Sequence, residues 1–153
     1  MSAHFSGRFS KSIEEMLREA GWLPGRDVSR GLKLPEGFTL FPAAQRVLSE
    51  FGNLRIGKSG PGLVFARTPV VLDPALAFGE EGRFHEFAVL LKTNLYPLGE
   101  TADGHSFVVI DEKGRVFLIF EEISFVDETF ELALDNLLQG ARQIRMVDEN
   151  GNW

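Results

Sequence analysis

The chain has 153 residues, of which 44% are hydrophobic and 25% are charged, and it carries a formal net charge of −6 and no cysteine. This size and composition are typical of one globular domain. The missing cysteines exclude disulfides, thiolate zinc sites and cysteine nucleophiles, and they fit a reducing compartment. No apolar run reaches the about 18 residues of a membrane-spanning helix, and the polar start does not resemble a signal peptide, so we expect a cytoplasmic protein without a membrane partner.

The negative charge is concentrated in the last third of the chain. Residues 101–153 carry eleven acidic and four basic residues, a net charge of −7, whereas residues 1–100 carry a net charge of +1. An acidic surface repels nucleic acid and attracts a basic protein. The asymmetry argues against nucleic-acid binding and leaves two interpretations open: an interface for a basic protein, or an ordinary solvated surface.

Residues 1–11 have the composition of a loose lead-in, and a helix is predicted to begin at Ser12. Ser12 and Glu15 have the spacing of a capping box, in which each side chain accepts a hydrogen bond from a free backbone N–H of the first turn. Apolar residues at helical spacing continue the pattern to Ala20. Gly21 suits the left-handed position that ends a helix.

The stretch after this helix places Trp22 and Arg26 on either side of a Pro24-Gly25 turn. One interpretation is that the turn displays both side chains to a ligand. The favoured one is structural, with Trp22 folded back over the last helical turn and Arg26 bound to carbonyls at that helix end.

The remaining elements follow from apolar periodicity and turn residues. Helices are expected over 42–51, 82–93 and 129–138, and extended segments over 54–56, 63–73 (interrupted by Pro69), 107–110, 116–120 and 123–126. Gly52 and Gly140 end two of these helices, and residues 141–153 form a polar tail that is expected to fray. Short hairpin connections favour a single α+β domain over a parallel βαβ sheet.

One motif, "GNLRIGKS" from Gly52 to Ser59, matches the phosphate-loop pattern that binds nucleotides. That loop works only between a strand and a helix, because the amides at a helix N-terminus bind the phosphate. Here a predicted helix precedes the motif and Gly60-Pro61-Gly62 follows it. Nucleotide binding is therefore kept only as a minor alternative.

The residues that could support catalysis do not form a recognisable site. No second histidine stands four residues from His85, so the zinc-protease pair is absent, and Ser106 does not lie in a Gly-x-Ser-x-Gly elbow. The histidines are His4, His85 and His105, and the adjacent acidic pairs are Glu80-Glu81, Asp111-Glu112, Glu121-Glu122 and Asp127-Glu128. We interpret all of them as surface or turn residues, and we expect no catalytic residue, metal or cofactor.

Five stretches together resemble one family. They are "AGWLPGR" (20–26), "LSEFGNL" (48–54), "LYPLGE" (95–100), "IDEKGRVF" (110–117) and "ALDNLLQG" (133–140). In order and spacing they resemble the SUKH superfamily of bacterial immunity proteins, specifically its third subfamily, over about residues 12–140. The pattern departs at Asn53, where a glycine is expected, and Asn also tolerates a left-handed backbone.

The resemblance implies a SUKH-like α+β domain with an antiparallel sheet flanked by helices, and a protein that binds and neutralises a cognate toxin without catalysis. The toxin would belong to a polymorphic or contact-dependent system and would often be a nuclease. The residues taken as structural within the shared stretches are Gly21, Trp22, Pro24, Gly25, Arg26, Gly52, Pro97, Gly99, Gly114 and Gly140. The alternative is a non-catalytic regulatory adaptor with the same fold.

If the toxin is basic, acidic residues of the last third are expected to speed association and cover its substrate-binding surface. The residues chosen for this hypothesis are Asp103, Glu121, Glu122, Asp127 and Glu128. Charge reversal at Glu121 and Glu122 is expected to slow association with the toxin.

Overall fold

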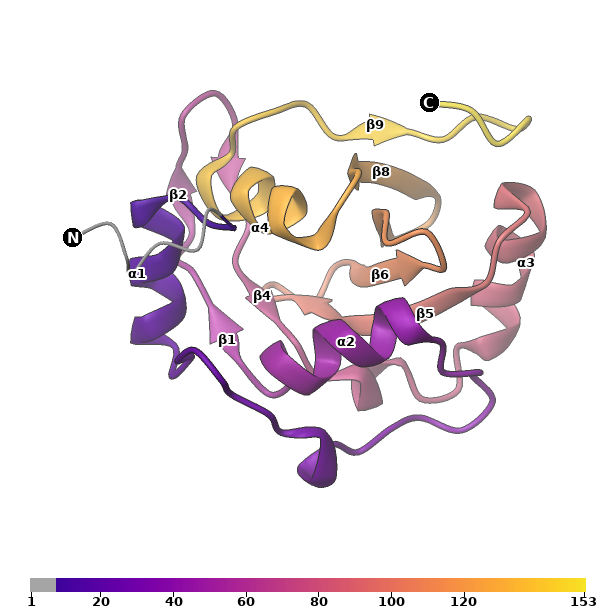
Figure 1. The fold of residues 1–153 in the computed structure, drawn as a ribbon. Coiled ribbons are helices and arrows are strands. Elements are labelled where there is room, and N and C mark those ends of the chain that lie inside the picture. The colour runs from indigo at the N-terminus through magenta and orange to yellow at the C-terminus, as the bar shows by residue number, and fades with distance from the viewer. Residues whose placement is uncertain (1–7) are drawn as a thin grey trace.

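The computed structural model describes residues 8–153 (Figure 1). The helices are α1 (Lys11–Glu19), α2 (Pro42–Phe51), α3 (Glu81–Leu91) and α4 (Phe130–Gln139), with short 3-10 turns η2 (Ser29–Gly31) and η3 (Pro74–Ala77). The strands are β1 (Arg55–Ile56), β2 (Gly60–Pro61), β3 (Ala66–Arg67), β4 (Val70–Val71), β5 (Leu95–Thr101), β6 (Phe107–Asp111), β7 (Val116–Ile119), β8 (Ile123–Asp127) and β9 (Arg145–Met146).

Seven strands form one antiparallel sheet in the order β1-β4-β5-β6-β7-β8-β9, while β2 and β3 form a separate hairpin. Side chains alternate between the two faces of the sheet. Val108 and Ile110 face the core that α1, α2 and α4 cover, whereas Val109 and Phe117 face a second core under α3 and the C-terminal segment. The predicted α+β class, an antiparallel sheet flanked by helices, is confirmed.

The first helix begins at Lys11, one residue earlier than predicted, and its N-cap lies two residues before the predicted cap at Ser12. Ser10 is its N-cap, and the Ser10 hydroxyl accepts a hydrogen bond from the Ile13 amide at 3.3 Å. The predicted capping box of Ser12 and Glu15 is therefore wrong, because Ser12 already lies in the first turn. Phe9 is buried immediately before the cap, so the chain enters the helix from the core side.

The end of α1 is as expected from Gly21. This glycine has φ 108°, and the Trp22 amide donates to the Leu17 carbonyl at 2.9 Å while the Gly21 amide donates to Arg18 at 3.1 Å. These two bonds form a Schellman motif, which satisfies carbonyls that the helix leaves free. The backbone thus turns sharply and directs Trp22 into the core, where it is 4% exposed.

The C-terminal segment is ordered, so the expected fraying of residues 141–153 is wrong. β9 pairs with β8, Val147 is buried, and the ring of Trp153 stacks on Phe125 with centroids 4.7 Å apart. Trp153 also meets the edge of Phe117 at 5.6 Å. The segment folds back because it covers apolar surface of the second core, a contact that no local sequence pattern reveals.

The described part of the N-terminal lead-in is also packed rather than loose. Phe9 contacts Trp22 and Phe51 edge-on, with centroids 6.1 Å and 5.9 Å apart. Arg8 binds Glu50 and Glu131, which belong to α2 and α4. His4 lies outside the described residues, as does the rest of the lead-in before Arg8.

Candidate functional site

The phosphate-loop alternative is wrong for "GNLRIGKS". Gly52 is the C-cap of α2, Arg55 and Ile56 are strand residues, and Ser59 runs directly into β2 rather than into a helix. No helix N-terminus is therefore available for a phosphate at Ser59. Asn53 adopts φ 67°, the left-handed conformation for which its side chain is suited.

The histidines, Ser106 and Asp111 do not assemble a catalytic group. Ser106 and Asp111 lie near opposite ends of β6, His85 is exposed on α3, and the His105 side chain is 75% exposed. Residues 8–153 contain no cluster of three His, Asp or Glu side chains that would hold a metal. No helix in this range is long and apolar enough to cross a membrane.

Asp111 is not a solvated turn residue, contrary to the expectation for the acidic pairs. Its side chain is fully buried and accepts hydrogen bonds from the amides of Lys113 and Arg115, both at 2.9 Å, and from Arg115 Nε at 2.7 Å. The carboxylate organises the β6–β7 turn, because it holds two amides and a guanidinium in fixed positions. Its role is structural.

Trp22 and Arg26 also hold the fold together. The indole N–H of Trp22 donates to Glu50 Oε2 at 3.0 Å, so the polar edge of this buried ring is satisfied. Arg26 donates to the carbonyls of Glu50 and Gly52, at 2.6 Å and 2.8 Å. The expectation that Arg26 binds carbonyls of the first helix is wrong: it caps the C-terminus of α2, which has no basic residue of its own in the last turn.

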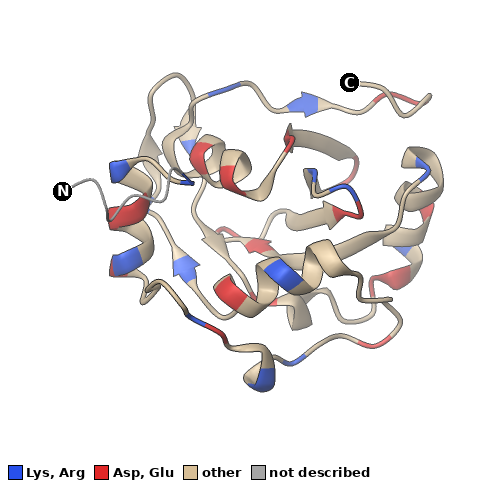
Figure 2. Cartoon of the chain, viewed as in Figure 1, with Lys and Arg blue, Asp and Glu red and all other residues tan. Residues whose placement is uncertain are grey.

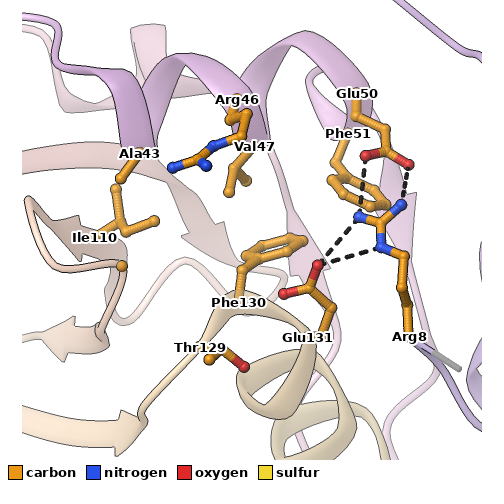
Figure 3. A pocket seen from close by; sticks show the side chains of 11 residues that line it. Arg8, Ala43, Arg46, Val47, Glu50, Phe51, Ile110, Thr129, Phe130 and Glu131 are labelled. Carbon is orange, nitrogen blue, oxygen red and sulfur yellow. Dashed lines mark hydrogen bonds and ion pairs between the residues drawn. The ribbon is translucent and has the colours of Figure 1, made fainter.

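Glu50 and Arg8 lie beside a cavity of about 250 Å³ between α2 and α4 (Figure 3). Val47, Phe51 and Phe130 supply apolar walls, and Arg8 reaches across to Glu50 and Glu131. Hydrogen bonding to Glu50 raises the pKa of Arg8 above its ordinary value. The two carboxylates that line the cavity, Glu50 and Glu131, are both paired with Arg8, so this region fastens the N-terminal segment to the core.

The other structural positions lie in turns and strand irregularities. Pro97 and Gly99 flank a register shift in the pairing of β5 with β6, and Gly114 adopts φ 89° in the β6–β7 turn. Gly25, with φ 85°, follows Pro24 in the exposed turn after α1. These positions shape the backbone and contribute no reactive group.

The five acidic residues of the interface hypothesis separate into two groups. Asp103 lies in the β5–β6 turn, and Glu121 and Glu122 lie in the β7–β8 turn. These turns occupy the same end of the sheet because Phe107 pairs with Ile119. We call Asp103, Glu121 and Glu122, with His105 and Phe120, the acidic end.

Asp127 and Glu128 lie at the opposite end of β8. Asp127 Oδ2 is 2.9 Å from Arg142 Nε, so its charge is compensated within the chain. Acidic residues are spread over several elements in Figure 2, and the concentrated charge of the last third does not form one patch.

Asp103 is held rigidly at the acidic end. Its Oδ1 accepts hydrogen bonds from the Thr101 hydroxyl at 2.6 Å and from the His105 amide at 3.0 Å. The Thr101 hydrogen bond, followed by that of His105, holds the pKa of Asp103 below its ordinary value. The ring of His105 lies 6.3 Å from that of Phe120, whose side chain is about half exposed. The end therefore presents a half-exposed aromatic ring beside a carboxylate, Asp103, that hydrogen bonds hold in place.

A second exposed feature was not predicted. Leu63, Val64 and Phe65 form the tip of the β2–β3 hairpin and are 71%, 69% and 46% exposed. The sequence predicts an extended segment over 63–73, interrupted by Pro69, and does not predict that its first three residues are exposed. The flanking Gly62 and the interruption at Pro69 were the available signs that this stretch leaves the main sheet.

The described part of the fold therefore presents exposed charged and apolar surfaces and no assembled catalytic group. A family model described as "SUKH-3 immunity protein" matches residues 9–140. The chain belongs to the SUKH-3 immunity protein family, whose members are typically non-catalytic. Comparisons with curated proteins and with solved structures give no significant match.

Proposed function

We propose that this chain neutralises a cognate bacterial toxin by forming a stoichiometric complex with it in the cytoplasm. Membership of an immunity protein family is the single observation that carries the proposal. The toxin belongs to a polymorphic or contact-dependent competition system and is the product of a gene beside that of this chain.

The toxin approaches the acidic end first. Glu121 and Glu122 are exposed in one tight turn, and neither forms an ion pair with another described residue. Unpaired exposed charges steer an oppositely charged partner and raise the association rate. Asp127 and Glu128 contribute only to the long-range field, since they lie at the other end of β8 and Asp127 is paired with Arg142.

This charge suits a toxin of the nuclease type. An enzyme that acts on nucleic acid needs a basic surface to bind phosphates. Carboxylates placed on that surface compete with the substrate directly, and Phe120 adds apolar contact area beside them. Neutralisation then requires occupancy of the toxin's substrate site and no chemical step.

Co-expression tests the proposal. The toxin domain encoded beside this chain is induced in a bacterial host, with and without the chain, and growth is measured. The wild-type chain is expected to restore growth, and the E121K/E122K variant to restore it less well. E36K/E86K is the matched control, because it makes the same change in net charge at two exposed residues away from the acidic end. Failure of the wild-type chain to restore growth would contradict immunity and favour the adaptor role.

A further inference from the structure

The β2–β3 hairpin tip is an unusual surface. Among residues 8–153, Leu63, Val64 and Phe65 are the one run of three consecutive exposed large apolar side chains, with exposed fractions of 71%, 69% and 46%. Isolated exposed apolar residues are ordinary, whereas contiguous ones mark contact surfaces. In Figure 1 the hairpin stands at the margin of the molecule, beside the C-terminal end of α4.

The tip is held in place by backbone hydrogen bonds rather than by burial of its side chains. The Leu63 amide donates to the Gln139 carbonyl at 2.7 Å, and the amides of Val64 and Phe65 both donate to the Gly140 carbonyl at 2.9 Å. The loop thereby caps the C-terminus of α4. Because its backbone is already ordered, a partner that binds the tip loses little conformational entropy there.

Close approach of the loop to α4 depends on glycine at two positions. A Cβ at Gly140 would collide with the Phe65 carbonyl, and one at Gly62 would collide with the carbonyls of Gln139 and Phe65. The loop thus needs glycine at both positions to pack against α4, and yet three of its large apolar side chains remain exposed. Stability of the chain itself does not explain that exposure, since burying such residues would be favourable.

The base of the hairpin is positively charged. Lys58 and Arg67 form no ion pair with any described carboxylate, and Arg67 Nε is buried without a hydrogen-bond acceptor. Both residues line a cavity of about 360 Å³ between the hairpin and α1, whose other wall carries Glu15 and Glu19. Because neither cation has a described carboxylate within ion-pair distance, Lys58 and Arg67 favour a partner that supplies negative charge here.

The hairpin also adjoins the acidic end. Arg67 and Ser59 line a second cavity, of about 270 Å³, together with Asp103. The apolar tip therefore has cations at its base, and that base shares a cavity with the carboxylate Asp103 of the β5–β6 turn. An apolar centre bordered by charged groups of both signs is the usual anatomy of a specific protein interface.

We propose that Leu63 and Val64 are the apolar anchor of the toxin interface, seated in a hydrophobic recess of the toxin whose rim places a carboxylate opposite Lys58 and Arg67. This inference rests on the proposed function and deepens it: the acidic end governs the rate of encounter, and the hairpin tip governs the lifetime of the complex.

The test measures binding kinetics of the full chain to a catalytically inactive form of the toxin domain encoded beside it. The L63S/V64S variant is compared with L23S/V89S, which makes the same two substitutions at sites 59% and 64% exposed, in the turn after α1 and on α3. Loss of an interface anchor is expected to weaken binding about 100-fold, mainly through faster dissociation, while the control stays within about 3-fold of wild type. K58E is expected to weaken binding by about 10-fold through loss of charge complementarity.

The outcomes separate the two proposals. If the wild-type chain binds and L63S/V64S binds within about 3-fold of it, the anchor is overturned while the proposed function stands. If L23S/V89S loses as much affinity as L63S/V64S, the anchor is likewise overturned. If L63S/V64S instead converts a dimer to a monomer in light scattering with toxin binding unchanged, the tip joins two copies of this chain and the proposal is wrong. If the wild-type chain does not bind, both proposals fall. Thermal unfolding of each variant checks that it is folded.

Discussion

The indole nitrogen of Trp22 lies 3.0 Å from Oε2 of Glu50, and Arg8 Nη1 lies 3.0 Å from the same oxygen. One carboxylate thus joins the turn after α1, the N-terminal segment and α2. Arg8 extends the network to Glu131 on α4 at 3.1 Å. Segments distant in sequence are fastened by a charged centre at the edge of an aromatic cluster that includes Phe9 and Phe51.

Glu50→Ala is expected to lower the free energy of unfolding by about 2 kcal/mol, because it removes hydrogen bonds to a charged group and leaves the Trp22 N–H unpaired. Trp22→Phe keeps most of the buried ring and is expected to cost about 1–2 kcal/mol. In a double-mutant cycle measured by urea unfolding, the double variant should lose about 1 kcal/mol less free energy of unfolding than the sum of the two single losses. Additive effects would show that the Trp22–Glu50 contact contributes nothing to stability.

Gly140→Ala is expected to destabilise the fold more than Gly114→Ala. Both glycines have positive φ, 61° and 89°, so both substitutions carry the about 1–2 kcal/mol of left-handed backbone strain. Only the Gly140 Cβ meets another atom, the Phe65 carbonyl, whereas nothing lies within 4 Å of a Cβ at Gly114. Hydrogen exchange should show loss of protection at the amides of residues 63–65 in Gly140→Ala alone. Equal protection in both variants would contradict the docking of the hairpin on α4.

Asp111→Ala is expected to cost about 3 kcal/mol, because it removes a buried carboxylate and leaves Arg115 and two turn amides without an acceptor. Asp148 provides the matched control, since it accepts hydrogen bonds from two backbone amides in the same way but is exposed. Asp148→Ala is expected to cost about 1 kcal/mol. Chemical unfolding of both variants measures the difference, and similar losses would show that Asp111 works only as a local turn residue.

Thr101→Val is expected to raise the pKa of Asp103, because the Thr101 hydroxyl is the main cause that holds it low. A depressed folded-state pKa stabilises the fold above the ordinary Asp pKa of about 3.9, and this stability is lost as the pH falls through the folded-state value. In the variant this contribution to stability should be smaller, and its loss should be complete at a higher pH. Titration of the Asp103 carboxyl carbon by NMR gives the answer, and an unchanged midpoint would refute the assigned cause.

Association of the chain with its toxin is expected to slow as salt concentration rises, because exposed charges are screened over a Debye length of about 8 Å at physiological ionic strength. E121K/E122K should show a slower association rate and a weaker dependence on salt, with its dissociation rate nearly unchanged. E36K/E86K should keep the wild-type salt dependence. If the association rates of the two variants depend on salt concentration to the same extent, the acidic end does not contribute to the encounter with the toxin.

The main elements of the fold were predictable because they depend on local patterns. The apolar spacing of residues 42–51 and the glycine at position 140 predicted α2 and the end of α4 within a residue or two. Ser10 and Ser12 are equally good caps by composition, and only the burial of Phe9 distinguishes them. Trp153 lies in a polar tail, so its stacking on Phe125 depends on a tertiary contact without a periodic signal.

The candidate surfaces were less predictable because charge counts carry no spatial information. Asp103 and Glu122 are brought to one end of the sheet by strand register, which also sends Asp127 to the other. Asp111 looks like its neighbour Glu112 in sequence, yet it is buried and Glu112 is exposed. Leu63 and Val64 have the composition of a core strand, and their exposure follows from the docking of a short hairpin on α4.

The most direct test of immunity by binding is a titration of toxin activity with the purified wild-type chain. The toxin domain encoded beside the chain is held at a fixed concentration well above the dissociation constant, and its activity is followed as the chain is added. A protein that acts by binding is expected to abolish activity linearly, with the end point at one equivalent and no change on longer incubation. Progressive inactivation by far less than one equivalent would indicate a catalytic mechanism, and undiminished activity with excess chain would contradict immunity to that toxin.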